Sequence, residues 1–110
     1  MSRDWRLRVD DMVAAVNRSL AFTAGMSLDS FRADERTANA VLYDLLVIGE
    51  AAARLPEEVR RREPAVAWRE LIGMRNVIVH GYFALDSEVV WKTARNDLPV
   101  LLEALQRLLA

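Results

Sequence analysis

Apolar residues recur at intervals of three and four positions over four long stretches of this 110-residue chain. Since an α-helix turns once in about 3.6 residues, such spacing places the apolar side chains on one face of a helix. No strand-like alternation is longer than the segment VIVHGYF. The sequence therefore predicts an all-α fold in one domain over residues 1–110, an up-and-down four-helix bundle with short extra helices. The four main helices are expected over about residues 4–24, 34–55, 67–80 and 86–109.

Glycine, proline and capping residues predict where these helices begin and end. Gly25 and Gly81 stand where the first and third helices should stop, because glycine tolerates the left-handed conformation that follows many helices. Asp34 is of the type that caps a helix N-terminus. Pro56 ends the second helix or starts the short segment PEEVRRR, since proline suits a first helical turn. Pro99 lies inside the fourth helix and is expected to kink it, because it removes a backbone hydrogen bond.

Composition excludes several classes of site and indicates association. The chain has no cysteine and a single histidine, which excludes disulfides and makes a zinc site improbable, so we expect neither a metal nor a cofactor. A hydrophobic content of 53% is high for so short a chain and predicts apolar surface left for a homo-oligomer. Neither a secretory signal nor a membrane-spanning run is present, which favours a cytoplasmic protein. With a net charge of −1, contact with nucleic acid must depend on local basic patches.

The single histidine lies in the stretch MRNVIVHGYF, which concentrates polar groups at a predicted helix end. Asn76 and His80 are one turn apart on one face. A straight helix would turn Arg75 well away from His80, but a long arginine side chain and unwinding at Gly81 would let the two converge. Tyr82 would then fold back from the loop. One polar cluster is feasible from these residues.

Such a cluster has a plain chemical use on RNA. A guanidinium stabilises charge on a phosphoryl group, and an imidazole moves protons near neutral pH. Together they would help a 2′-hydroxyl attack the adjacent phosphate without a metal. The structural alternative is that His80 bonds to terminal helix carbonyls and Arg75 forms a surface salt bridge. Asn76 would then be a hydrogen-bonded amide and Tyr82 a packing ring. The spacing alone leaves both interpretations open.

The sequence resembles the HepT-like branch of the HEPN domain superfamily over nearly its whole length. Three blocks carry the resemblance, DERTANAVLYDLLVIGEAAARLP, WRELIGMRNVIVHGYF and VVWKTARNDLPVLLEAL. The family signature Arg-x4-His-x-Tyr is present as Arg75, His80 and Tyr82, with Asn76 beside the arginine as the family prefers. Ala67 stands where the family is expected to have proline, which affects a helix start and not the site.

The resemblance implies a function and partners. Members are helical-bundle homodimers that act as toxins of bacterial or archaeal toxin–antitoxin pairs, as metal-independent endoribonucleases, with tRNA a substrate by family analogy. The antitoxin is a minimal nucleotidyltransferase that adds AMP to the motif tyrosine. Carried over to this chain, Arg75 and His80 are the catalytic pair, Asn76 supports them, and Tyr82 is the AMPylation target. The family's active sites lie near the dimer interface.

Further charged residues have two interpretations each. Glu50 lies on a mostly apolar helix surface, where it either orients Arg75 or His80 or forms a structural ion pair with another arginine. The cluster Arg60–Arg62 with Arg69 either contacts an RNA backbone or forms a solvated face. Glutamates interleaved with these arginines favour the solvated face.

Two functions from other classes remain as alternatives to the ribonuclease. One is a non-catalytic HEPN dimer that binds a nucleotidyltransferase partner or a nucleotide through the polar cluster. The other is a dimeric scaffold in which the cluster caps a helix. Substitution of Arg75 or His80 separates these hypotheses, because only the ribonuclease loses RNA cleavage.

Overall fold

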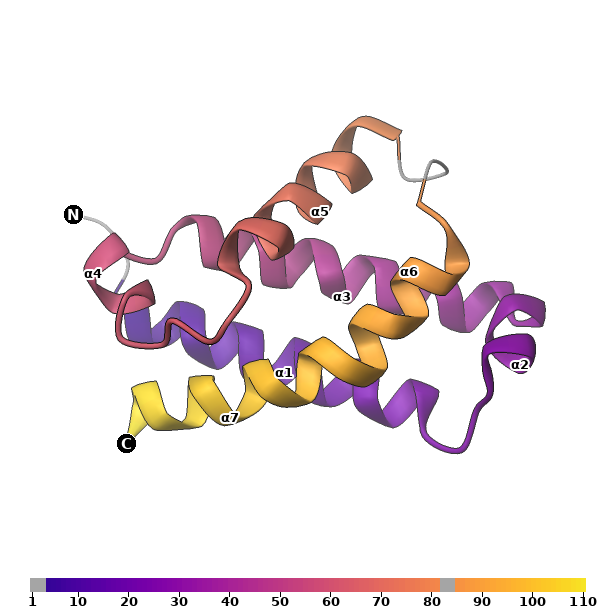
Figure 1. Cartoon of the computed structure of the whole chain (residues 1–110), viewed down its shortest axis with the longest axis horizontal. Helices are drawn as coiled ribbons and strands as arrows, with labels where there is room; N and C mark the ends of the chain where they lie inside the picture. Colours follow the sequence, from indigo (N-terminus) through magenta and orange to yellow (C-terminus); the bar gives the residue numbers. More distant parts are fainter. Residues whose placement is uncertain (1–3, 82–84) are drawn as a thin grey trace.

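The computed structural model describes residues 4–81 and 85–110, and within these ranges every regular element is a helix (Figure 1). The all-α prediction is confirmed. In chain order the elements are α1 (Trp5–Thr23), α2 (Leu28–Ala33), α3 (Glu35–Ala53), α4 (Glu57–Arg60), α5 (Trp68–Gly81), α6 (Ser87–Lys92), the π-helical segment η2 (Thr93–Asp97) and α7 (Leu98–Leu109).

The long helices run alternately in opposite directions and pack side by side (Figure 1). α3 packs against α1 on one side and α5 on the other, and α7 packs against α1. Their apolar faces meet in one core. Its largest fully buried side chains are Phe31, Met12, Ile48, Leu98, Leu101 and Leu105.

The predicted helix boundaries follow local chemistry. Asp34 caps α3, because its Oδ1 accepts a hydrogen bond of 3.0 Å from the backbone N–H of Thr37. Gly25 follows α1 with φ of 76°, in the left-handed region that favours glycine. Pro56 precedes α4 as its N-cap residue. Gly81 is still the last residue of α5, so this helix continues one residue beyond its predicted end.

The irregularity expected at Pro99 lies in the preceding turn. Residues 93–97 form the π-helical segment η2, and the Leu98 N–H donates to the Thr93 carbonyl, five residues back. Pro99 itself falls in the first turn of α7, where a missing N–H is tolerated. The wider π-helical turn therefore lets α6, η2 and α7 continue as one helical run with no loop between them.

A buried carboxylate fixes α3 relative to α1. The side chain of Asp44 is 1% exposed, and its Oδ1 accepts a 2.9 Å hydrogen bond from Arg18 Nε. The Ser19 hydroxyl donates to Oδ2 at 2.8 Å. Because a buried charge is costly unless paired and hydrogen-bonded, these contacts select one register between the two helices.

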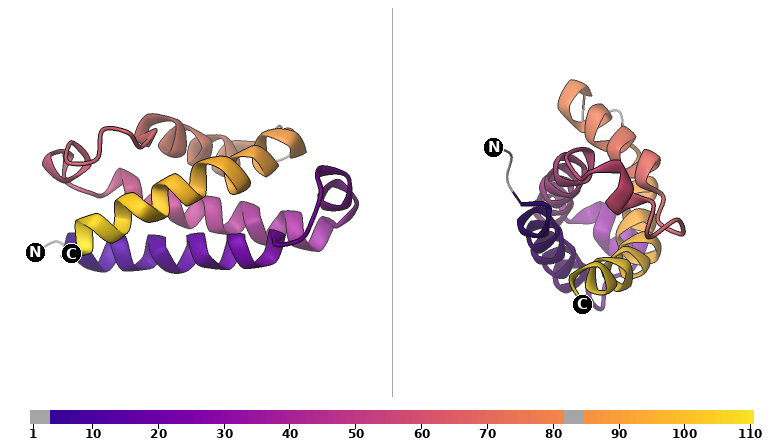
Figure 2. Two further views of the ribbon diagram at one scale, coloured as in Figure 1. Left: turned by 60° about the horizontal axis from the view of Figure 1, so that its bottom comes forward. Right: turned by 90° about the vertical axis from the view of Figure 1, so that its left-hand side faces the viewer.

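α5 differs from the other long helices in standing partly outside the bundle. The end-on view shows its C-terminal half projecting from the ring formed by α1, α3 and α7 (Figure 2). Leu71 is its one buried residue. At its start, Trp68 Nε1 donates to the carbonyls of Arg60 and Glu63, each at 3.1 Å, and so ties α5 to the end of α4 and the segment after it. Among the described helices, none has the length and apolar content to cross a membrane.

Candidate functional site

The face of α5 that points away from α3 carries the predicted polar residues. Leu71 packs inward, whereas Arg69, Gly73, Asn76 and His80 are exposed and recur at intervals of four, three and four. This spacing is one stripe along a helix, because each step is close to a whole turn. The candidate site therefore extends along one side of α5, from the start of the helix to its end.

Arg75 lies at the edge between the inner and outer faces. A Cβ at Gly49 would overlap the Cβ of Arg75, so glycine allows α3 to approach α5 at this point. The Nε of Arg75 is 3.3 Å from Glu50 Oε1, and the Arg75 side chain is 26% exposed. This contact is an ion pair by distance but lacks hydrogen-bond geometry, since the buried Nε has no hydrogen-bond partner among the described residues. Glu50 also lies 3.8 Å from Arg54 Nη2.

His80 and Asn76 share a shallow hollow at the end of α5. Val77 and Gly81 complete its lining, and its volume is about 360 Å³. His80 is exposed, and within the described ranges its imidazole forms neither a hydrogen bond nor an ion pair. The carbonyl-capping interpretation of His80 therefore has no support from these contacts. An unengaged imidazole on the surface is accessible to a ligand.

Arg75 and His80 border the same exposed face without touching. Because α5 remains helical through Gly81, five residues place their side chains about 140° apart around the helix axis. The shorter arc between them passes over Asn76 and Val79, and Val79 is 54% exposed. The structure thus brings Asn76 to His80 and Glu50 to Arg75. The helix does not unwind before Gly81, so the pair Asn76 and His80 stays apart from the pair Glu50 and Arg75. Tyr82 lies outside the described residues.

Two features of this site have no counterpart in the sequence interpretation. The apolar spacing places Gly49 beside the apolar face of its helix. Its close approach to Arg75 depends on the packing of two helices that are distant in sequence, which the spacing does not reveal. Val77 and Val79 are apolar residues of α5, but they are 40% and 54% exposed. The VIV run would signal such exposure, because three consecutive apolar residues cannot all face one side of a helix.

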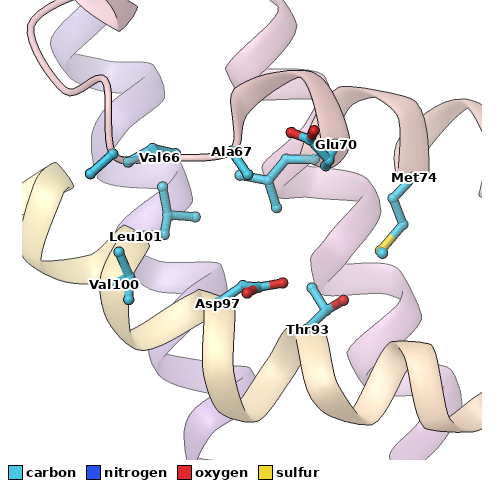
Figure 3. Close-up of a pocket in the computed structure, with 10 residues that line it drawn as sticks. Val66, Ala67, Glu70, Met74, Thr93, Asp97, Val100 and Leu101 are labelled. Carbon is cyan, nitrogen blue, oxygen red and sulfur yellow. The ribbon is translucent and has the colours of Figure 1, made fainter.

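A separate cavity lies on the other side of α5 (Figure 3). It has a volume of about 180 Å³ and lies between Glu70 and Met74 of α5 on one side and Thr93 and Asp97 of η2 and Val100 of α7 on the other. Of the predicted site residues that the structure describes, none lines it. The residues that the structure describes contain no group of three histidine, cysteine or acidic side chains that could hold a metal ion.

Comparison with known proteins decides the family. The model of the family described as "Ribonuclease HepT-like" matches residues 12–108. The chain belongs to the HepT-like ribonuclease family. A relative from Thermococcus cleftensis named "Probable ribonuclease HepT" is 35% identical over 101 residues, which are 92% of each chain.

Other relatives of this HepT-like chain have similar names. A "Putative RNase" of Methanocaldococcus jannaschii is 30% identical over 107 residues, 97% of this chain and 92% of the relative. Another with the same description, from Caldanaerobacter subterraneus, is 33% identical over 85 residues, 77% of this chain and 76% of the relative. No solved structure matches the chain. The resemblance carried by three sequence blocks is therefore confirmed at the level of the family.

Proposed function

We propose that this HepT-like chain is the toxin of a HepT/MntA-type toxin–antitoxin pair and an endoribonuclease that cleaves RNA, tRNA by family analogy, without a metal. Membership of a ribonuclease family supports the reaction class. The observation that carries the site assignment is the exposed imidazole of His80 beside Asn76, which has no partner among the described residues, on the face that Arg75 borders.

Each side chain then has a role in transferring the phosphoryl group. His80 accepts the proton of the 2′-hydroxyl, whose oxygen attacks phosphorus as the bond to the 5′-oxygen breaks. A proton returned by the imidazolium neutralises the leaving 5′-oxygen, and the products are a 2′,3′-cyclic phosphate and a 5′-hydroxyl. Arg75 stabilises the negative charge that builds on the phosphoryl oxygens. Asn76 lies between them and can donate its amide N–H to the same group.

The proposed active site includes residues from two associated chains. Arg75 and His80 do not meet in one chain, and the face between them carries the exposed Val79, with Val77 beside His80. Apolar side chains exposed beside a polar site favour an interface between two copies. In such a homodimer the two α5 ends would supply both polar groups to one substrate.

The proposed antitoxin is a minimal nucleotidyltransferase that adds AMP to Tyr82. Tyr82 follows directly after α5, seven residues from Arg75 and two from His80. The phosphate of the adduct would add negative charge and bulk near the guanidinium, in competition with an RNA phosphate. Purified antitoxin with ATP should therefore increase the mass of the toxin by one AMP and stop cleavage, and a Tyr82→Phe variant should resist both effects.

Cleavage of RNA in the presence of EDTA tests the ribonuclease directly. We expect His80→Ala to lower the rate at least about 100-fold, as for loss of an acid–base group. Arg75→Ala should lower it by a similar factor or more, because a charge-stabilising donor is lost. Arg36→Ala is the matched control, since this exposed arginine lies on α3 outside the site. Light scattering should show the same dimer for all variants, and undiminished cleavage by both site variants would overturn the assignment.

The alternative is a non-catalytic dimer that binds a nucleotidyltransferase or a nucleotide. One observation favours it, namely that Arg75 is engaged by Glu50 and does not contact His80. This alternative predicts tight binding of the nucleotidyltransferase or of a nucleotide and no cleavage of any RNA, by wild type or variants. Cleavage that depends on His80 in EDTA would exclude it.

A further inference from the structure

A second groove on the outer side of α5 gathers three arginines. Arg60 and Arg61 come from α4 and the residue after it, and Arg69 comes from the first turn of α5. The groove has a volume of about 710 Å³, within the roughly 300–1,000 Å³ typical of ligand sites. Its lining contains one carboxylate, that of Glu57. The groove therefore has a clear excess of positive charge.

Packing has directed two of the interleaved glutamates, Glu63 and Glu70, away from these arginines. Glu63 is held by Arg107, with Nη2 at 2.7 Å from Oε1, and its side chain is 12% exposed. Glu70 faces the cavity on the opposite side of α5 (Figure 3). Glu57 pairs with Arg61 at 3.0 Å. Within the described residues, the guanidinium groups of Arg60 and Arg69 have no ion pair.

The floor of the groove is bare helix backbone at Gly73. A Cβ at this position would meet nothing within 4 Å, so packing within the chain does not require glycine there. Glycine inside a helix costs about 1 kcal/mol relative to alanine. At Gly49 the same residue type is explained by Arg75, whereas at Gly73 the space remains open toward the groove. Open backbone between arginines suits the close approach of a bulky anionic chain.

The groove continues into the hollow that contains His80. Asn76 lines both, and the stripe Arg69, Gly73, Asn76 and His80 runs from one to the other. Arg69 and His80 are eleven residues apart, which is about 16 Å along a helix. At roughly 3.4 Å per nucleotide of a stacked strand, this length covers about five nucleotides.

We propose that this groove binds the backbone of single-stranded RNA next to the scissile bond. Arg60, Arg61 and Arg69 contact phosphates, and the strand passes over Gly73 and Asn76 to reach His80. The proposal rests on the ribonuclease function and adds to it a substrate-binding surface distinct from the catalytic pair. Because arginine contacts to phosphate do not read bases, the groove positions the strand and does not select its sequence.

Binding of an uncleavable RNA tests the groove separately from catalysis. The probe is a fluorescent single-stranded 2′-O-methyl oligoribonucleotide, followed by anisotropy with the full chain over a range of salt concentrations. Replacing Arg60 and Arg69 together by glutamine should weaken binding about tenfold or more at 0.1 M salt, and should lower the slope of log K against log [salt] by about 1.4. The double variant Arg8→Gln with Arg36→Gln removes the same charge outside the groove and should bind nearly as wild type does.

A steric pair of variants gives an independent readout. Gly73→Leu should fill the groove and weaken binding, whereas Gly73→Ala adds one methyl group and should retain most of it. Circular dichroism should show that both variants remain helical.

The outcomes separate the groove from the catalytic assignment. Equal binding by wild type and the Arg60/Arg69 variant, with cleavage intact, would overturn the groove and leave the ribonuclease standing. If the Arg60/Arg69 variant binds the oligonucleotide more weakly, but neither wild type nor any variant cleaves RNA, the groove is supported and the proposed ribonuclease function is wrong. If the groove instead binds an acidic peptide of a partner protein, wild type will show no salt-dependent affinity for the oligonucleotide, and the proposal fails.

Discussion

Gly49 of α3 lies directly against the Cβ of Arg75 of α5, with no room for a side chain on the glycine. The Leu71 carbonyl oxygen is 3.0 Å from the point that a Cβ at Gly49 would occupy, so backbone as well as side chain limits the space. This contact places the arginine that borders the candidate site on a rigid part of the bundle. Glu50, the next residue of α3, then reaches the guanidinium.

Gly49→Ala should destabilise the fold and disturb the site together. Because neither the α5 backbone nor the Arg75 Cβ can move freely, we expect a loss of about 1–3 kcal/mol in the free energy of unfolding, as for other overpacked positions. Urea denaturation followed by circular dichroism measures it. Gly73→Ala in the same helix pair is the matched control and should instead stabilise by up to about 1 kcal/mol. Equal effects of the two substitutions would contradict the packing argument.

Glu50→Gln should lower RNA cleavage more than stability. The Glu50 side chain is 41% exposed, so its ion pair with Arg75 contributes less than about 1 kcal/mol to folding. If this ion pair orients the guanidinium, the loss should fall mainly on kcat. Arg54→Gln removes the other partner of Glu50 and is the control, with kcat near that of wild type. A kcat unchanged in Glu50→Gln would show that this carboxylate does not position Arg75.

Asp44→Ala should be among the more destabilising substitutions and should leave cleavage per folded molecule unchanged. It leaves the Ser19 hydroxyl buried without an acceptor and removes the pair to Arg18, for an expected loss of about 2–4 kcal/mol. Glu88→Gln breaks ion pairs whose side chains are more than 40% exposed and should lower stability much less than Asp44→Ala does. Chemical denaturation distinguishes the two, and similar values for both would argue against the role of Asp44 in setting the register.

Acid sensitivity should depend in part on Glu63. The hydrogen bonds from Arg107, and to a lesser degree its charge, hold the pKa of the Glu63 carboxyl below its ordinary value of 4.5. Because the folded pKa is depressed, the stabilisation is present above the unfolded value of 4.5 and is lost as pH falls through the folded pKa. Glu63→Gln should therefore flatten the decrease in unfolding free energy below about pH 4.5, measured by urea titration from pH 6 to 3.

Glu58→Gln provides the comparison for that titration. Glu58 is exposed and lacks an ion pair within the described residues, so its substitution should leave the acid limb of the curve as in wild type. A wild-type-like acid limb in Glu63→Gln would mean that the contact with Arg107 is already lost in solution.

The sequence by itself determined where the helices lie, because the signals are local. Apolar spacing and the cap at Asp34 act within one or two turns, and the positive φ at Gly25 is a property of that residue. The motif residues Arg75 and His80 could also be singled out from sequence, and so could the family. Even the irregularity near Pro99 could be located to within a turn, although its π-helical form could not be foreseen.

Only the tertiary structure decided which faces of α5 are covered and which remain open. Gly49 meets Arg75 across 26 positions of sequence, and Arg107 removes Glu63 from the arginine cluster across 44. Such contacts depend on how the helices cross and on their register, which a local pattern does not encode. The same packing opens the groove over Gly73, since a helix packed mainly against one neighbour leaves its far side to solvent.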